Sequence, residues 1–122
     1  MANDLDTTAR NVGVDAIAAL ALRVALHTGD PGGANGAANE VTGGSPAYAR
    51  KAIAWNAAAA GAATPTANVV LDVPATTVSW VSLWNTAGTV RYYKKDVTDE
   101  VFAGQGTYTV LAAGTSIDLN DA

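Results

Sequence analysis

Short segments in which apolar and polar residues alternate make up most of this chain after its first 21 residues. Alternation with a period of two is typical of β-strands that bury one face. It predicts strands over residues 22–27, 47–55, 68–73, 76–85, 89–95, 107–113 and 115–120. Short strands repeating roughly every ten residues favour a small antiparallel β-sandwich or barrel. We therefore predict a mainly β fold.

The segment TTVSWVSLWN, residues 76–85, is apolar on both of its faces. Regular alternation places Val78, Trp80 and Trp84 on one side of this strand and Val81 and Leu83 on the other. A strand that is apolar on both sides is normally covered on both sides. We expect this strand to lie at the centre of the fold.

Glycines mark two of the predicted turns. The sequence NTAG at residues 85–88 ends in Gly88, which is suited to a positive φ, so residues 89–95 return as the partner strand of a hairpin. Gly114 separates the last two predicted strands in the same way. The pattern therefore predicts two hairpins in the second half of the chain.

One segment, residues 6–21, has helical periodicity instead. Asp6 or Thr7 can cap a helix here. Gly13 inside it costs about 1 kcal/mol relative to alanine, so the helix depends on packing against the rest of the chain. The residues expected to share its packing face are Val12, Ala16, Ile17 and Leu20.

A long glycine-rich segment separates the first two predicted strands. Residues 25–50 read ALHTGDPGGANGAANEVTGGSPAYAR. Loops longer than about 12 to 15 residues without secondary structure are uncommon in compact domains, and they are usually either functional or disordered. The segment at 28–46 therefore needs an explanation of its own.

The length of 122 residues is enough for one hydrophobic core, so we expect a single domain over residues 1–122. Hydrophobic residues make up 49% of the chain, but much of that is alanine, and there are only three Trp, four Tyr and one Phe. The predicted core is thin. Burial against a partner would help to stabilise it.

The net charge of −4 and the isoelectric point of about 4.6 argue against nucleic acid as a partner. The basic cluster RYYKKD at residues 91–96 interleaves aromatic and basic side chains, but such a cluster is more often a solvated strand face. The absence of cysteine excludes disulfides. The longest apolar run near the N-terminus, residues 16–22, is too short to cross a bilayer, so we expect no membrane partner.

His27 is the only histidine, and therefore the only usual general base. A catalytic triad with Asp30 and Ser45 can be drawn on the sequence. A histidine that hydrogen-bonds to loop backbone is the commoner arrangement. We therefore expect no enzymatic activity.

The loop also carries oxygen ligands of the kind that calcium prefers. Asp30, Asn35, Asn39 and Glu40 all lie within it, but their spacing does not match an EF-hand. Zinc sites need several histidines or cysteines. The sequence GGANGAA is not followed by the acidic residue of a dinucleotide-binding fingerprint. We expect no metal and no cofactor.

Five motifs occur in order along the chain: LHTGDPG, NEVTGG, YARKAIAW, VSLWN and AAGTSIDL. Together they resemble a family of small virion structural proteins of tailed bacteriophages, of which some are labelled tail-fibre-like and others look like capsid decoration proteins. The resemblance spans about residue 10 to residue 120. It implies a structural role in the virion, without an enzymatic activity, for a chain made in the host cytoplasm.

Within that family, we predict a capsid decoration (cement) protein that binds the outer surface of the major capsid shell as a homotrimer. Many modest contacts stabilise a shell when they engage together, and an acidic surface complements basic patches. The arm at 28–46 is the predicted contact, and glycines permit close backbone approach. Because ordering costs roughly 1 to 2 kcal/mol per residue, we expect a neighbouring subunit to order it. The predicted interface residues are His27, Asp30, Asn35, Asn39, Glu40, Tyr48 and Arg50.

The alternative is a tail fibre or minor tail protein that contributes to attachment to the host surface. In that case aromatic side chains would stack on a surface glycan, although core packing is the commoner use of tryptophan. The candidates are Trp80, Trp84, Tyr92 and Tyr93. The sequence does not decide between head and tail.

Overall fold

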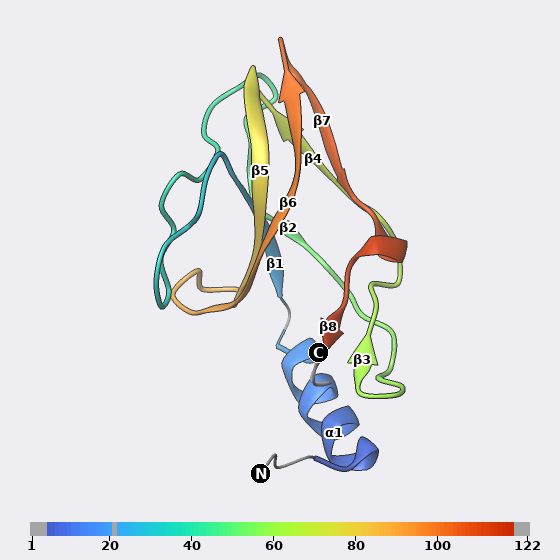
Figure 1. Ribbon diagram of the computed structural model, residues 1–122. Coiled ribbons are helices and arrows are strands. Elements are labelled where there is room, and N and C mark those ends of the chain that lie inside the picture. The colour runs from blue at the N-terminus through green and yellow to red at the C-terminus, as the bar shows by residue number, and fades with distance from the viewer. Residues whose placement is uncertain (1–4, 21, 119–122) are drawn as a thin grey trace.

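The computed structural model describes residues 5–20 and 22–118 (Figure 1). In this part of the chain, helix α1 spans Thr7–Ala18 and the short 3-10 helix η1 spans Ala112–Gly114. The predicted mainly β fold with one N-terminal α-helix is confirmed, with eight described strands in antiparallel sheets that do not close into a barrel. The strands are β1 (Arg23–His27), β2 (Lys51–Ala52), β3 (Ala62–Ala63), β4 (Val69–Val73), β5 (Thr76–Trp84), β6 (Arg91–Phe102), β7 (Gly106–Val110) and β8 (Ile117–Asp118).

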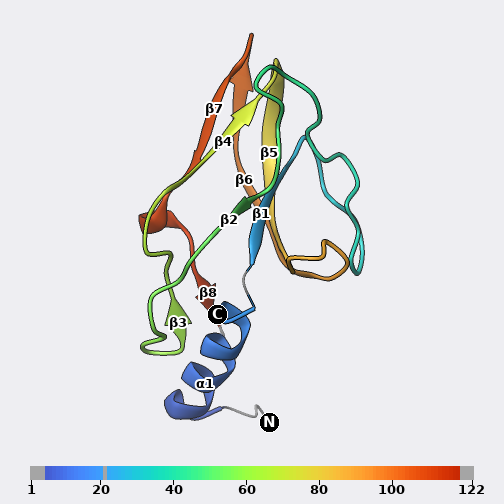
Figure 2. The same cartoon turned by 180° about the vertical axis from the view of Figure 1, so that it is seen from behind.

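The largest sheet has the strand order β2-β1-β5-β6, and β4-β7 and β3-β8 form two smaller sheets. Figures 1 and 2 show that β4 and β7 lie across one side of the β5–β6 hairpin, while α1, β3 and β8 gather at one end of the molecule. The core fills the space between these layers. Its main residues are Val24, Leu26, Leu71, Val73, Val78, Val81, Leu83 and Val110.

Strand β5 has two buried faces, as predicted. Leu26 of β1 lies opposite Val81, so both side chains point into the core. His27 lies opposite Trp80, so these two point to the other side of the sheet, which the loop after β1 covers. The prediction that Val78 shares a face with Trp80 is wrong. A register shift lies between the two residues, and Val78 belongs to the core.

The predicted hairpin turn at 85–88 joins β5 to β6. The backbone N–H of Asn85 donates to Val90 at 3.0 Å, and that of Gly88 donates to Asn85 at 3.0 Å. Gly88 has a φ of 74°, in the region that glycine adopts without steric cost. Strand β6 then continues to Phe102, beyond the predicted end at 95, because β5 pairs with it as far as Thr76 opposite Phe102.

The helix packs only partly through the predicted face, because Ile17 contacts the core whereas Val12, Ala16 and Leu20 are exposed. Val14 is buried, whereas Val12 and Leu20 are 66% and 42% exposed. The side chain of Asn11 accepts a hydrogen bond from Gly61 N, and that of Asp15 accepts one from Ala58 N, both at 2.8 Å. The loop before β3 offers unpaired N–H groups to the helix, so a face with polar acceptors packs there. The predicted last residue, Ala21, lies outside the described residues.

The predicted strand at 47–55 is reduced to β2, which pairs with β1 only at Lys51 opposite Val24 and Ala52 opposite Arg23. The segment before it turns away from the sheet, because Tyr48 and Arg50 bind an acidic side chain of the loop.

The last two predicted strands do not form a hairpin around Gly114. Strand β7 pairs with β4, and β8 pairs with β3. Strand β7 ends at Val110, before the predicted end at 113, and Ala112 and Ala113 form η1 together with Gly114. The reason is that each strand finds its hydrogen-bonding partner far away in the sequence. Residues 119 and 120 of the prediction lie outside the described residues.

We expect Leu71→Ala to lower the free energy of unfolding by about 2 to 5 kcal/mol, because Leu71 is fully buried and its removal leaves a cavity. Leu111→Ala is the matched control, since Leu111 is 57% exposed and should lose less than about 0.5 kcal/mol. Chemical denaturation measures both values. Equal losses would contradict the assignment of Leu71 to the core.

Candidate functional site

The glycine-rich loop between β1 and β2 closes on itself next to the sheet. Thr28 N donates to Asn39 O at 2.8 Å, and Val41 N donates to Leu26 O at 3.0 Å. These bonds bring both ends of residues 28–39 together. Within this part, Gly36 N donates to Gly33 O at 2.8 Å. A β-carbon at Gly36 would lie 2.5 Å from Pro31 O, so only glycine fits this turn.

The second part of the loop, at Ser45 and Pro46, is hydrogen-bonded to the turn that joins β6 to β7. Gln105, in the turn between β6 and β7, accepts a hydrogen bond from Ser45 N at 2.9 Å and donates one to Pro46 O at 3.0 Å. A β-carbon at Gly44 would lie 2.7 Å from the Gln105 oxygen. The loop is therefore held at two separate places on the fold.

Two cations of β6 hold the first part of the loop against the sheet. The Arg91 guanidinium donates to the carbonyls of Gly32 at 3.0 Å, Gly33 at 2.8 Å and Gly36 at 2.5 Å. Lys94 Nζ donates to Asp30 Oδ1 at 2.8 Å and to Gly32 O at 2.9 Å. Glycine carbonyls are accessible acceptors because no side chain shields them.

The expectation that a neighbouring subunit must order this loop is therefore wrong. The ordering comes from hydrogen bonds to the chain's own β6 and to the β6–β7 turn. Charge-assisted hydrogen bonds of this kind are stronger than neutral ones. Whether the outer surface of the loop contacts a partner remains a prediction.

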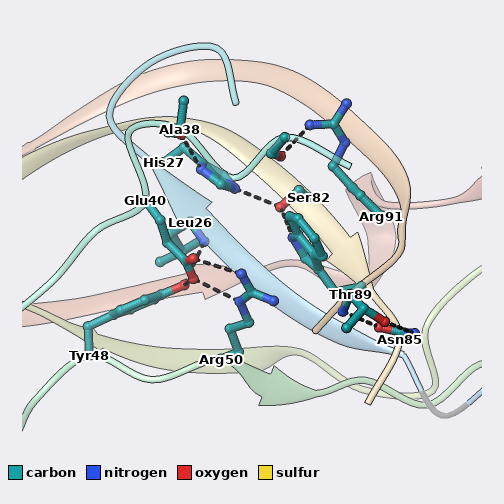
Figure 3. A network of polar contacts seen from close by, with 12 residues as sticks. Leu26, His27, Ala38, Glu40, Tyr48, Arg50, Ser82, Asn85, Thr89 and Arg91 are labelled. Carbon is teal, nitrogen blue, oxygen red and sulfur yellow. Dashed lines mark hydrogen bonds and ion pairs between the residues drawn. The ribbon is translucent and has the colours of Figure 1, made fainter. Parts of the chain in front are cut away.

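Beneath the loop, His27 is fully buried and takes part in a relay of hydrogen bonds (Figure 3). Its Nδ1 lies 2.9 Å from Ala38 O, and a carbonyl only accepts, so Nδ1 carries the proton. Trp84 Nε1 donates to Ser82 Oγ at 2.7 Å, and the Ser82 hydroxyl is 2.7 Å from His27 Nε2. The Ser82 proton is therefore donated to Nε2. Every polar atom of the relay is satisfied when His27 is neutral.

The triad drawn on the sequence does not assemble. Asp30 binds Lys94 instead of His27, and Ser45 lies with Gln105 at the other end of the loop. The serine next to His27 is Ser82, which is fully buried. His27 thus forms hydrogen bonds with Ser82 and Ala38 on the face of the sheet that the loop covers.

The four oxygen-bearing residues considered as calcium ligands also have partners inside the chain. Asn35 Oδ1 accepts from Arg91 N at 2.9 Å, and Asn39 donates to Asp30 O at 3.1 Å. Glu40 binds Arg50 through both carboxylate oxygens, at 2.8 and 2.9 Å. Among the described residues, no cluster of three or more histidine or acidic side chains is placed to hold a metal.

Glu40 is the centre of a second polar cluster, drawn in Figure 3. Tyr48 donates its hydroxyl proton to Glu40 at 2.8 Å and accepts a hydrogen bond from Leu26 N at 3.0 Å. Arg50, bound to the same carboxylate, lies over the ring of Trp84 at 4.3 Å from its centre. This cluster joins the end of the loop to the edge of the sheet.

The charges in and around the loop shift the pKa values of its side chains. Burial is the largest effect on Glu40 and would raise its pKa, but hydrogen bonds from Arg50 and Tyr48 outweigh burial and lower it. The hydrogen bond from Lys94 lowers the pKa of Asp30. Burial lowers the pKa of His27, although its bond to Ala38 and the charge of Glu40 act in the opposite direction. His27 is therefore neutral near pH 7.

Sequence reasoning selected the seven loop and flanking residues but missed their partners. Ser82, Arg91, Lys94 and Gln105 hold these residues in place. The signal for two of them was present, because the cluster RYYKKD is the place where cations gather beside a carbonyl-rich loop. Its interpretation as a solvated strand face was wrong for Arg91 and Lys94.

The aromatic residues considered for glycan stacking differ in their surroundings. Trp84 is 2% exposed, and Trp80 lies beneath Lys94, whose Nζ is 5.4 Å from the ring centre. Tyr92 is 42% exposed and Tyr93 is half-buried. The tryptophans thus pack under the loop and its cations, whereas the tyrosines remain accessible.

We expect Lys94→Ala to speed amide hydrogen exchange at Gly32 and Gly36, because the loop loses its bonds to Lys94. We expect the exchange rate to rise roughly threefold to tenfold, which corresponds to the net free-energy contribution of one hydrogen bond. Lys95→Ala is the matched control, since Lys95 does not contact the loop. Unchanged exchange in Lys94→Ala would show that this cation does not hold the loop.

We expect the protein to lose stability as the pH falls from about 7 to about 5. The unfolded chain binds a proton at His27 near pH 6.5, but the folded chain, with its lowered pKa, does not. The loss is about 1.4 kcal/mol for each pH unit between these two pKa values.

In His27→Gln, which cannot titrate, this part of the stability profile should be flat. Thermal unfolding at stepped pH measures it. The lowered pKa values of Asp30 and Glu40 act only at lower pH, below about 4.5. An unchanged slope between pH 7 and 5 in His27→Gln would contradict the role given to His27.

No curated protein and no solved structure matches the chain significantly. A family model does match, over residues 2–115, and its description is Podophage GP4 fiber I protein gp80. None of the helices in the described residues is both long and apolar enough to cross a membrane. The chain belongs to this family of phage fiber proteins, and it is a structural protein of a bacteriophage virion.

Proposed function

We propose that the chain is a component of a virion fibre and acts by binding, without a chemical step. The observation that carries this proposal is the family match over residues 2–115 of 122. The buried histidine supports it, because the groups that would be needed for a triad are bound elsewhere or enclosed. The function is then to present a rigid surface.

A fibre role is favoured over capsid decoration because the matching family is described as a fiber protein. This supports the alternative of the sequence analysis better than its first choice. Attachment to the major capsid protein as a cement remains a prediction with no finding in its favour beyond the shared virion origin. The proposed location is therefore the fibre of the virion, where it contributes to host-surface attachment.

We also propose that the chain is a homo-oligomer, as symmetric assemblies are the usual form of repeated structural proteins. The outer face of α1 supports this. Ala9, Val12, Ala16 and Ala19 recur at alternating spacings of three and four residues and are all exposed. That spacing is typical of helices that pack against other helices. A trimer is the state that we predict.

We expect an antibody against this chain to label the tail fibres of purified virions in electron micrographs, with the shell surface unlabelled. An antibody against the major capsid protein serves as the positive control for the shell. Even labelling of the shell by the first antibody would overturn the fibre assignment. It would support capsid decoration instead.

A further inference from the structure

Strands β6 and β7 leave a groove between them. The short turn at residues 103–105 joins the two strands, which then diverge, as both ribbon views show (Figures 1 and 2). Within residues 5–20 and 22–118, neither strand has a partner on its facing edge, because β6 ends the four-stranded sheet and β7 pairs only with β4. The groove has a volume of about 410 Å³, within the usual range for small-molecule sites.

The floor of the groove is apolar and its walls are aromatic. Val81, Val97 and Val110 line it from three different strands. Tyr93 comes from β6 and Tyr108 from β7, and both rings are half-buried against the core. Burial raises the pKa of both tyrosines, so their hydroxyls stay protonated and can donate.

The polar side chains of the groove have no hydrogen-bonding partner among the described residues. This holds for the hydroxyls of the two tyrosines and for the other polar side chains that line the groove. The loop-covered face is the opposite case, because there each interface residue of the sequence analysis is bound inside the chain. Three of these residues, Tyr93, Lys95 and Tyr108, lie opposite core residues, so their side chains start on the inner side of the groove. The other polar residues that line it are Asp96, Thr98, Thr109 and Thr115.

Two open strand edges also suggest a peptide strand as occupant, but β6 disfavours this. Lys95 lies opposite Val81, so its side chain starts on the inner face of the sheet. A charged residue that points inward on an edge strand is a device that prevents strand addition. The register shift opposite residues 78–80 interrupts the edge as well.

We propose that this groove binds a saccharide unit. A sugar ring has an apolar C–H face, which fits the tyrosine rings and the valine floor, and a rim of hydroxyls. Lys95, which starts on the same face as the valine floor, donates to these hydroxyls, and the hydroxyls of Tyr93 and Tyr108 donate to them or accept from them. Tyrosine suits such a site because its ring is apolar and its hydroxyl is polar. This inference rests on the proposed attachment function and gives it a ligand class.

The test is a titration of the full ¹⁵N-labelled chain with glucose, galactose, N-acetylglucosamine and glucuronic acid, followed by amide NMR shifts. We expect at least one of these sugars to produce saturable shifts at residues 95–98 and 108–111. Lys95→Met should weaken that binding roughly tenfold, which corresponds to about 1.4 kcal/mol. Tyr108→Ala should abolish it.

Tyr92→Ala is the matched control, because Tyr92 does not line the groove, and its binding should be unchanged. Lys95→Met keeps the test valid if Tyr108→Ala does not fold. Absence of saturable shifts with all four sugars would overturn the proposal, as would saturable shifts confined to the loop. Shifts at the groove with a Thr-Val-Thr-Val-Thr-Val peptide and none with sugars would also overturn it and would identify a strand-binding edge.

The outcome is independent of the antibody experiment on virions. Fibre labelling without sugar binding would remove the groove assignment and leave the fibre function intact. Sugar binding by a chain that labels the shell would remove the fibre function and leave the groove assignment intact.

Discussion

The two buried faces of β5 are the constraint on which the rest of the fold depends. Its inner face meets the β4–β7 sheet across an aliphatic core, which requires no polar partners. Its outer face carries Trp80, Ser82 and Trp84 beside His27 of β1. Once the loop covers these side chains, their polar atoms lose water and must bond to one another. The relay from Trp84 through Ser82 and His27 to the loop backbone meets this requirement.

The loop that covers this face is unusual in length and composition, yet it is held by ordinary interactions. Its glycines permit tight turns and expose carbonyls, and Arg91 and Lys94 bind those carbonyls. Fixing a glycine-rich backbone costs conformational entropy, which these charge-assisted bonds offset. A surface that is already ordered loses little freedom on binding. The exposed part of the loop is therefore suited to a preformed contact in an assembly.

The loop-covered side of the molecule and the groove between β6 and β7 differ in whether their polar side chains have partners inside the chain. On the loop side, acidic and basic groups neutralise one another within the chain, as in the Glu40–Arg50 ion pair at 2.8 Å. Between β6 and β7, tyrosines and charged groups line a groove without internal partners. Recognition of another molecule needs such unsatisfied groups. For this member of a phage fiber family, we infer that the loop side contributes rigidity and that the groove contributes binding.

The sequence by itself determined the mainly β class, the β5–β6 turn and the burial of β5 on both faces, because these follow from local alternation and from Gly88. It also selected His27, Glu40, Tyr48 and Arg50. Tertiary structure alone decided that β7 pairs with β4 and that α1 packs through Val14 instead of Val12. It also brought Ser82, Arg91 and Lys94 to the loop. Strand partners and packing faces depend on contacts between residues distant in the chain, and local periodicity carries no information about those contacts.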